Sequence, residues 1–359
     1  MKILSLFSGI GAFERALENL NIPHEIVAYC EIDKYASKAY SILHNVDESL
    51  NLHDVTTVDC SKLPKDIDLV TYGFPCQDIS TAGKQRGLEH EGENTRSGLV
   101  WEAHRIIKDT KPKVAICENV KNLVGKKFRK DFEIILKNLE DMGYNNYWQV
   151  LNAKDYGVPQ NRERVFIVSI RKDVDKGSFV FPEKQRLTKC LRDILDDNVD
   201  QKYYLSEKML NYFRENSAKM EAKNGGFRFK PSEGNSVAFT ITTKEGNRME
   251  NNFIIKLRAL TPKEPDAYRV YEPNNGIARC LKSEGGGGLG AKTGLYIMKN
   301  KESIRKLTPP ECFCLMGFDK QDALLLREKG ISDTQLYKMA GNSIVVDVLM
   351  GIFKNLYNV

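Results

Sequence analysis

The chain has 359 residues, of which 41% are hydrophobic and 28% are charged, and its formal net charge is +6. This composition is ordinary for a globular protein, and the length predicts two domains. No apolar run is long enough to span a bilayer, and Glu14-Arg15 interrupts the apolar N-terminus, so we expect neither a membrane span nor a signal peptide. The positive charge permits a polyanionic partner without requiring one.

The eight cysteines show no C-x-x-C pair. Cys312 and Cys314 stand one residue apart on a predicted helix, which is a poor geometry for a metal. We therefore expect free thiols, a reducing cytoplasmic environment and no metal site.

The N-terminus has the pattern of a nucleotide-binding unit. Residues 3–7 are an apolar run that predicts a strand, and residues 13–20 have apolar positions at helical spacing. Gly9 and Gly11 lie between them, where glycines let the backbone approach a ligand and where the helix offers free N–H groups.

Two acidic residues follow at the ends of further predicted strands. Residues 25–30 predict a strand that ends at Glu31, 20 positions after Gly11, where an acid binds ribose hydroxyls in nucleotide-binding sheets. Asp54 follows a short predicted strand and is by itself more typical of a loop or a helix cap. The pattern predicts an adenosine-containing cofactor. Glu14 occupies the place of the third fingerprint glycine, which disfavours NAD.

Cys76 follows the apolar run 68–72, which predicts a buried strand of a parallel sheet. Pro75 cannot continue the strand, so Cys76 should lie in a loop at its carboxyl end, where open α/β sheets bind ligands. A thiol in such a loop is a candidate nucleophile. The alternative for a single cysteine is a buried side chain that packs as a small hydrophobe.

The position of Glu118 favours the interpretation of Cys76 as a nucleophile. It comes at the end of the next predicted strand, 114–117, and successive strands are usually neighbours. We expect Cys76 and Glu118 to lie side by side, a reactive pairing of thiol and carboxylate. The long polar loop 77–98 between them carries four glycines, and such loops inside a compact domain are usually functional or disordered.

Residues 146–151 and 165–170 predict two further strands, and Arg162 and Arg164 precede the second one. Their alternation places both guanidinium groups on one face, although two such arginines alone are more typical of a solvated edge.

From about residue 173 the strand pattern stops. We predict a smaller, irregular domain over 173–299 and a catalytic domain made of 1–172 and 300–359. Within the small domain, 284–294 is glycine-rich, but Ala291 breaks the Gly-Lys pair of a phosphate loop. Near the C-terminus, Asn342 or Ser343 is a good N-cap for the apolar helix 344–353, which should pack back onto the first domain.

Five motifs together resemble the cytosine-C5 DNA methyltransferase family of prokaryotes and phages over nearly the whole chain. They are Phe7-Ser-Gly-Ile-Gly-Ala-Phe, Gly73-Phe-Pro-Cys-Gln, Glu118-Asn-Val, Gln160-Asn-Arg-Glu-Arg and Gly341-Asn-Ser. The resemblance implies an α/β fold, a Rossmann-like methyltransferase sheet with a smaller inserted target recognition domain. It also implies S-adenosylmethionine (AdoMet) as cofactor, S-adenosylhomocysteine as product and double-stranded DNA as substrate.

The resemblance also implies the roles of individual residues. Cys76 would add to C6 of a flipped-out cytosine so that C5 can be methylated, and Glu118 would hold the base at N3. Arg164 would contact O2, and Arg162 would position the base or its phosphate. The remaining family positions imply cofactor contacts by Phe7, Gly9, Gly11, Glu31, Asp54, Pro75, Asn342 and Ser343.

This sequence departs from the family pattern at two places. Ile32 stands where an aromatic residue usually follows the ribose-binding acid, and Cys280-Leu281 stands where a Thr-Leu pair precedes the glycine loop. By position, the candidate DNA contacts are Lys84, Gln85, Arg86, Arg269 and the 283–290 loop with Gly286 and Gly287.

Three alternatives remain open at this point. They are a tRNA methyltransferase of the same family, a nicotinamide oxidoreductase and a catalytically silent DNA-binding relative. The DNA target is not readable from the sequence. We expect a monomer. Whether a cognate restriction endonuclease acts in the same system is equally not readable from the sequence, and no stable complex with one is implied.

Overall fold

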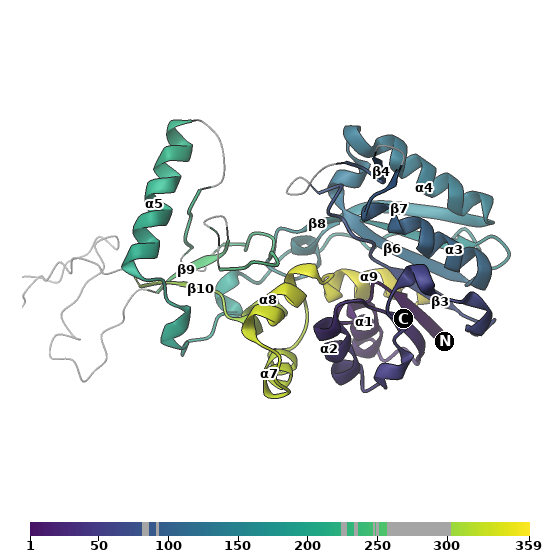
Figure 1. Cartoon of the computed structure of the whole chain (residues 1–359), viewed down its shortest axis with the longest axis horizontal. Coiled ribbons are helices and arrows are strands. Elements are labelled where there is room, and N and C mark those ends of the chain that lie inside the picture. Colours follow the sequence, from purple (N-terminus) through teal and green to yellow (C-terminus); the bar gives the residue numbers. More distant parts are fainter. Residues whose placement is uncertain are drawn as a thin grey trace, which may run out of the picture.

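The computed structural model describes residues 1–80, 86–90, 93–223, 228–232, 236–246, 248, 251–256 and 303–359. These residues form a large α/β unit and a smaller unit that extends from one end of it (Figure 1). Some residues of the predicted DNA contacts lie outside the described residues, namely Lys84, Gln85, Arg269, Gly286 and Gly287.

A six-stranded sheet in the order β2-β1-β3-β6-β8-β7 forms the centre of the large unit. Its strands are β1 (Lys2–Leu6), β2 (Glu25–Cys30), β3 (Leu69–Tyr72), β6 (Val114–Val120), β7 (Tyr144–Asn152) and β8 (Glu163–Arg171). The first four are parallel, as their apolar runs predict, whereas β8 is antiparallel to β6 and β7 is antiparallel to β8. The short strand expected before Asp54 is absent from the described residues, since Asn51 makes only an isolated bridge with Tyr29.

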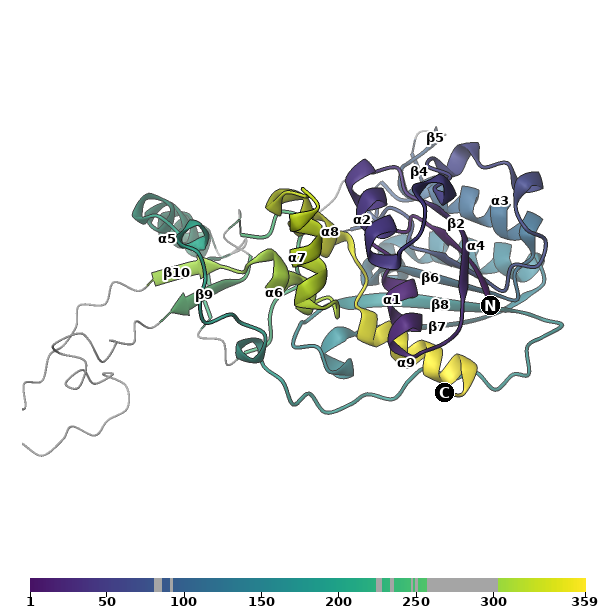
Figure 2. The same ribbon diagram turned by 90° about the horizontal axis from the view of Figure 1, so that it is seen from below.

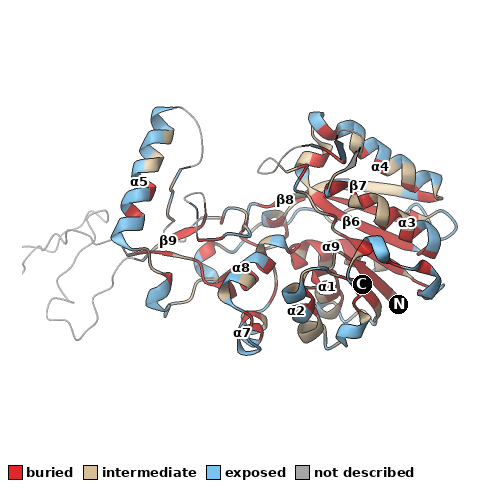
Figure 3. Cartoon of the chain, in the orientation of Figure 1, coloured by how far each residue is buried: buried red, intermediate tan, exposed pale blue. Residues whose placement is uncertain are grey.

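Helices cover both faces of the sheet. On one side are α1 (Ala12–Asn19) and α9 (Val346–Tyr357), with α2 (Lys34–His44) beside them; on the other are α3 (Val100–Thr110) and α4 (Arg129–Asp141) (Figures 1 and 2). Neighbouring strand residues enter opposite cores: Ile3 joins the core with α1 and α9, and Leu4 joins the core with α3 and α4. Burial is accordingly concentrated in the sheet and on the inner helix faces (Figure 3).

The C-terminal segment contains α6 (Pro309–Cys314), α7 (Lys320–Glu328), α8 (Asp333–Asn342) and α9. The last helix packs onto the first, as predicted, with the Phe13 and Phe353 ring centroids 6.4 Å apart. The predicted helix cap is wrong, because Asn342 is the final residue of α8 and α9 begins at Val346. Ser343 instead closes α8, since its N–H donates to the carbonyls of Met339 and Ala340.

Among the described residues, one run, Asp333–Tyr357, is long and apolar enough to cross a membrane by length and composition. About 61% of its apolar window is buried inside the fold, as in the core helix of a globular domain.

The smaller unit consists of α5 (Glu207–Ala222) with the antiparallel strands β9 (Phe253–Lys256) and β10 (Ser303–Lys306). A small core holds it together, made of Leu210, Phe213, Phe253 and Ile304. Residues 237–242 form no strand, and Ala238 makes an isolated bridge with Gln160 of the large unit.

The segment that follows β8 first runs back along the large unit (Figure 2). Phe179 lies in the same core as α1 and α9, and Pro182 lies against Gly351 of α9. This packing favours a domain boundary further along the chain than residue 173, and the boundary itself stays a prediction.

The polar loop after Cys76 contains a short antiparallel pair, β4 (Glu89–His90) and β5 (Glu93–Asn94).

Candidate active site

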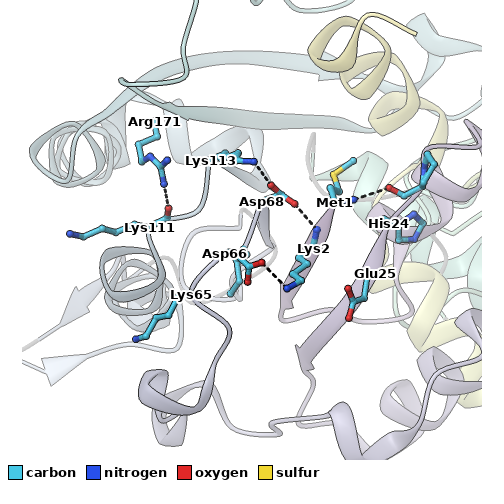
Figure 4. A pocket seen from close by; sticks show the side chains of 12 residues that line it. Met1, Lys2, His24, Glu25, Lys65, Asp66, Asp68, Lys111, Lys113 and Arg171 are labelled. Atoms are coloured by element: carbon cyan, nitrogen blue, oxygen red, sulfur yellow. Dashed lines mark hydrogen bonds and ion pairs between the residues drawn. The ribbon is translucent and has the colours of Figure 1, made fainter.

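A cavity of about 680 Å³ lies at the amino ends of β1, β3 and β6 (Figure 4). Charges on its wall pair with one another: Lys2 Nζ lies 2.7 Å from Asp66 Oδ2, and Lys113 Nζ lies 2.7 Å from Asp68 Oδ1. No residue that we predicted to act in catalysis or binding lines this cavity. Gly9, Glu31 and Cys76 lie beyond the carboxyl ends of β1, β2 and β3, whereas Glu118, which we expected after its strand, lies within β6 near its carboxyl end. The candidate site is therefore at the opposite end of these strands from the cavity.

The loop that carries Cys76 is fixed by side chains that bind its carbonyl groups. Asn119 Nδ2 donates to the Phe74 carbonyl at 3.0 Å, and Ser97 Oγ donates to the Pro75 carbonyl at 2.7 Å. The Cys76 carbonyl accepts from two following N–H groups, at 3.0 and 2.7 Å. These bonds hold the thiol at the carboxyl end of β3, as predicted from Pro75.

Glu118 and Arg164 form an ion pair beside this loop. Arg164 Nε lies 3.0 Å from Glu118 Oε1, and both side chains are largely buried. The pairing follows from the antiparallel register, in which Val120 of β6 lies opposite Arg164 of β8. Glu118 is two residues before Val120 and therefore faces the same side of the sheet. We predicted that Cys76 and Glu118 would lie close together. The pairing of β3 with β6 brings the ends of these two strands side by side.

The charges of this cluster act on one another. Burial raises the pKa of the Cys76 thiol, and the Glu118 charge raises it further, while Arg164 and Arg162 act in the opposite direction. Burial also raises the pKa of Glu118, against the lowering effect of the same two arginines. The resting thiol is therefore held protonated. A change that withdraws the negative charge of Glu118 would favour the thiolate.

A second carboxylate organises the glycine loop between β1 and α1. Glu31 Oε2 accepts from the Gly9 N–H at 2.9 Å, and Oε1 accepts from the Asp33 N–H at 2.8 Å. Burial raises the pKa of Glu31, and these two hydrogen bonds oppose the rise. Gly9 has a φ of 58°, and no described heavy atom outside its chain neighbours lies within 4 Å of where a Cβ would be. The backbone here is thus open to close approach by a ligand.

A sequence model described as C-5 cytosine-specific DNA methylase matches residues 1–358. The chain belongs to this family. Orphan methyltransferase M.SPRI of Bacillus phage SPR is 33% identical over 438 aligned positions, covering 99% of this chain and 97% of the phage protein. Type II methyltransferase M.HhaI of Haemophilus parahaemolyticus is 32% identical, covering 99% of this chain and 94% of that protein.

Solved structures show the same fold. The Entamoeba histolytica methyltransferase EhMeth aligns with a TM-score of 0.70 at 16% identity, covering 100% of this chain and 98% of that one. A Spodoptera frugiperda DNMT2 mutant aligns with a TM-score of 0.67 at 21% identity, covering 99% of both chains. The family, the fold and the reaction inferred from the motifs are thereby confirmed: the chain is a DNA cytosine-C5 methyltransferase. The oxidoreductase and tRNA alternatives are not supported by these matches.

In this methylase, Arg162 connects separate segments of the chain. Its guanidinium donates to the carbonyls of Ile241 at 3.1 Å, Gly341 at 3.1 Å and Ser343 at 2.7 Å. Arg162 is 4% exposed, and burial lowers its pKa to about 9. Its predicted contact with the base or phosphate stays a prediction: the two terminal nitrogens of the guanidinium bind backbone carbonyls, and the buried Nε has no hydrogen-bond partner among the described residues.

Close packing requires a glycine at the first position of the Gly341-Asn-Ser motif. A Cβ on Gly341 would lie 2.4 Å from the backbone of Thr242 and Thr243. The motif that the sequence associates with the cofactor thus packs directly on a segment of the predicted recognition domain.

Gly11 and Asp54 also have structural roles. A Cβ on Gly11 would lie 2.0 Å from Nε2 of His44, so this glycine makes room for a protein side chain. Asp54 caps a short 3-10 helix, Val55–Thr57, and accepts from the Thr56 N–H at 2.9 Å and from its hydroxyl at 2.8 Å. Their cofactor contacts, which the family resemblance implies, stay predictions.

Sequence reasoning missed three residues that support the site. Asn51 accepts from the Glu31 N–H at 3.0 Å and donates to the Glu31 carbonyl at 2.9 Å, which fixes the end of β2. Asn119 and Ser97 hold the Cys76 loop. His53 has a φ of 57°, in the left-handed region, and Asn51 lies two positions before it. This asparagine was the one local signal in the sequence of a tight turn. The other two contacts depend on tertiary pairing.

Proposed function

We propose that this methylase forms a covalent bond between Cys76 and C6 of a cytosine that has been flipped out of duplex DNA. The observation that supports the proposal is the cluster of Cys76, Glu118 and Arg164 at one edge of the sheet, where a thiol lies beside a buried ion pair. Ring carbons of cytosine are poor nucleophiles, and addition of sulfur at C6 makes C5 electron-rich.

Each side chain of this cluster has a separate role in the proposed reaction. The Cys76 thiol gives up its proton to solvent water and its sulfur adds to C6, while Glu118 in its protonated form donates a hydrogen bond to N3, where negative charge develops. Arg164 binds O2 and keeps the Glu118 carboxylate in place. After C5 has been methylated, it loses its proton to a base, and the electron pair returns through the ring to expel the Cys76 thiolate. Exclusion of water by the loop 77–98 would support each of these steps.

AdoMet fits the residues of the glycine loop. Gly9 leaves the backbone open, Phe7 adopts the left-handed conformation with φ 54°, and Glu31 presents a carboxylate fixed by backbone donors. When bound, AdoMet supplies the methyl group. Ile32 is 75% exposed beside Glu31, so an apolar wall for an adenine ring is available although the usual aromatic residue is missing. The other residues proposed to line this site are Gly11, Asp54, Pro75, Asn342 and Ser343.

DNA recognition is proposed for the smaller unit. The predicted domain 173–299 includes α5 and β9, and its glycine loop and Arg269 are proposed to read the target. Arg86, which is exposed in the loop after Cys76, is a candidate phosphate contact, together with Lys84 and Gln85. We further propose a monomer that works in the cytoplasm, associated with the nucleoid when bound to DNA, and that modifies sites also recognised by a restriction endonuclease.

The covalent step is tested with duplex DNA that carries 5-fluorocytosine at the target. Fluorine at C5 cannot leave as a proton, so with AdoMet the adduct should survive denaturing electrophoresis. Cys76→Ala should remove both the adduct and methylation while DNA binding persists. Cys314→Ala, a matched change of another free cysteine, should leave both. A Cys76→Ala protein that still methylates C5, or an adduct mapped to a different cysteine, would refute the mechanism.

A further inference from the structure

Phe239 is an aromatic residue of the segment 236–246, and its side chain lies at the surface with an exposure of 50%. The nearby apolar residues Ala238 and Ile241 are instead buried, with exposures of 2% and 1%. One exposed apolar side chain is ordinary on a protein surface. Phe239 differs from an ordinary one in how its backbone is held and in how close it lies to Arg164.

Both backbone groups of Phe239 bind the same buried side chain. The Phe239 N–H donates to Asn252 Oδ1 at 2.8 Å, and Asn252 Nδ2 donates to the Phe239 carbonyl at 3.3 Å. Asn252 is itself anchored, because its N–H and its Nδ2 donate to Oε1 of the buried Glu245 at 2.6 and 3.2 Å. The amide of Asn252 therefore pairs with Phe239 as a neighbouring strand would, and it fixes this side of the segment.

The other side of the segment is bound to the chain just before β8. The Asn161 N–H donates to the Ala238 carbonyl at 2.8 Å, and the Thr240 hydroxyl donates to the Asn161 carbonyl at 2.6 Å. The residues on both sides of Phe239 are thus attached to the large unit. Its ring is exposed because a fixed backbone holds it at the surface, and not because the segment lacks attachment.

This attachment places Phe239 near the active-site end of the sheet. Asn161 stands three residues before Arg164, which an extended chain spans in about 10 Å, and paired segments lie about 4.8 Å apart. The backbone of Phe239 is therefore within roughly 15 Å of Arg164, the partner of Glu118. Since nucleotides of one strand follow one another at about 3.4 Å along the duplex axis, this distance corresponds to about four base pairs.

DNA is the partner that fits this surface. The chain is a DNA cytosine methyltransferase, and the proposed reaction brings its target base to Glu118 and Arg164. Lys244, exposed in the same segment, carries the charge that phosphates attract. An aromatic ring can stack on any base, and flipping one cytosine out of the duplex uncovers base faces that were stacked before.

We propose that Phe239 packs its ring against a base of the DNA beside the flipped-out cytosine, and that Asn252 is the positioning residue that presents this ring. The inference rests on the proposed function, which places the target cytosine at Glu118 and Arg164. The contact stabilises bound DNA and takes no part in methyl transfer. Its loss should therefore raise the KM for DNA and leave the KM for AdoMet unchanged.

Photocrosslinking detects the contact directly in the wild-type protein. Sequencing of bisulfite-treated DNA from an expressing cell identifies the target, and a short duplex is built around it. Each pyrimidine within about four base pairs of the target cytosine is replaced in turn by its 5-iodo form, which crosslinks to aromatic side chains on irradiation. Mass spectrometry should locate a crosslink at Phe239 for at least one position, and Asn252→Ala should lower its yield although the ring remains. A scan with no crosslink at Phe239 overturns the proposal.

Steady-state kinetics on the unmodified duplex measure what the contact contributes. Phe239→Ala should raise the KM for DNA roughly 5- to 100-fold, the loss of one base–aromatic stack, with kcat and the KM for AdoMet unchanged. Phe239→Trp keeps an aromatic face and should restore most of the affinity. The matched control is Ile134→Ala, which removes an exposed apolar side chain from α4 and should act as wild type. A wild-type KM for DNA in Phe239→Ala, or an equal rise in Ile134→Ala, refutes the contact.

The 5-fluorocytosine adduct separates this inference from the proposed function. An adduct that forms normally in a protein with no crosslink at Phe239 leaves the covalent mechanism intact and refutes the contact. A crosslink at Phe239 in a protein that forms no adduct refutes the covalent mechanism, and the DNA contact is retained. The crosslink needs no variant, so the contact is tested even if Phe239→Ala or Asn252→Ala folds poorly.

Discussion

Two buried carboxylates at the active-site end of the sheet are held in place by different kinds of partner. Near the proposed cofactor site, Glu31 is held by the backbone N–H groups of Gly9 and Asp33. Near Cys76, the proposed nucleophile, Glu118 is held by the guanidinium of Arg164. Burial raises the pKa of both carboxyl groups, so each is costly to ionise, but only one of them has a full positive charge in contact.

This difference matches two different tasks. Backbone donors fix the direction of a carboxylate and leave its remaining lone pairs for neutral hydroxyl donors, which suits binding without chemistry. A neighbouring guanidinium instead ties the carboxylate to a charge that also acts on the Cys76 thiol. A change at Glu118 should therefore alter the reactivity of Cys76, whereas a change at Glu31 should alter affinity alone.

The largest expected effect is that of Glu118→Gln. Loss of the group proposed to bind N3 should lower methylation by about 10²- to 10⁴-fold, the usual range for a positioned acid or base. The same change removes the negative charge that raises the pKa of Cys76, so that pKa falls and more thiolate is present at neutral pH. Alkylation of Cys76, followed by mass spectrometry across pH, should become faster although methylation is lost.

Glu163→Gln is the matched control for this experiment, because Glu163 pairs with Lys121 on the surface. It should leave methylation and Cys76 alkylation as in wild type. If alkylation is equally slow in Glu118→Gln and wild type, the Glu118 charge does not control the thiol, and the contrast between the two edges fails.

A smaller effect is expected for Glu31→Ala. Loss of one charge-assisted hydrogen-bonding partner should weaken AdoMet binding by about 1.5–3 kcal/mol while cofactor-free DNA binding survives. Since burial raises the pKa of Glu31, wild-type affinity should also decline as the pH falls through that raised value, and Glu31→Ala should lack this acid limb. Glu25→Ala, at the other end of β2, is the control for calorimetry. Unchanged AdoMet affinity in Glu31→Ala would contradict the proposal that Glu31 binds the ribose of AdoMet.

Changes in stability should distinguish the two glycines of the loop. Both have positive φ, so an alanine at either position costs about 1 kcal/mol or somewhat more in stability. Gly11→Ala should cost roughly 1–3 kcal/mol in addition, because its Cβ would overlap the His44 ring. Gly9→Ala has space on the protein side and should instead impair AdoMet binding. Urea unfolding and calorimetry, compared for the pair, would contradict this if Gly9→Ala were the less stable variant.

The sequence predicted those features that short stretches of chain determine. Buried apolar runs ended by Glu31 or by Pro75-Cys76 identified the parallel strands and the edge on which their functional residues lie. The order of strands followed from the rule that successive strands are neighbours, which placed Cys76 beside Glu118. The helix predicted around Cys312 and Cys314 is likewise present, as α6.

Features that depend on distant contacts were not predictable in this way. Ser343 was a plausible helix cap by residue type, but α8 continues through Asn342, and Ile344 and Val345 are buried between the helices. Arg162 had the pattern of a residue on a solvated edge or in a substrate site, yet its partners come from segments about 80 and 180 positions away. The fit of His44 beside Gly11 had no local signal, because the two residues become neighbours only when α2 packs on α1.

The direction of β8 has a consequence for the path of the chain. Because β8 runs opposite to β6, its first residues, including Arg164, start at the active-site edge, and its last residue, Arg171, ends at the far edge. A nine-residue strand spans roughly 30 Å, so the chain must travel that distance back before it can build a unit beside the active site. The segment containing Phe179 and Pro182 runs back over this distance along α9. Shortening it should therefore move the smaller unit away from the active-site end of the sheet, even though no hydrogen bond or ion pair joins residues 172–182 to Cys76, Glu118 or Arg164.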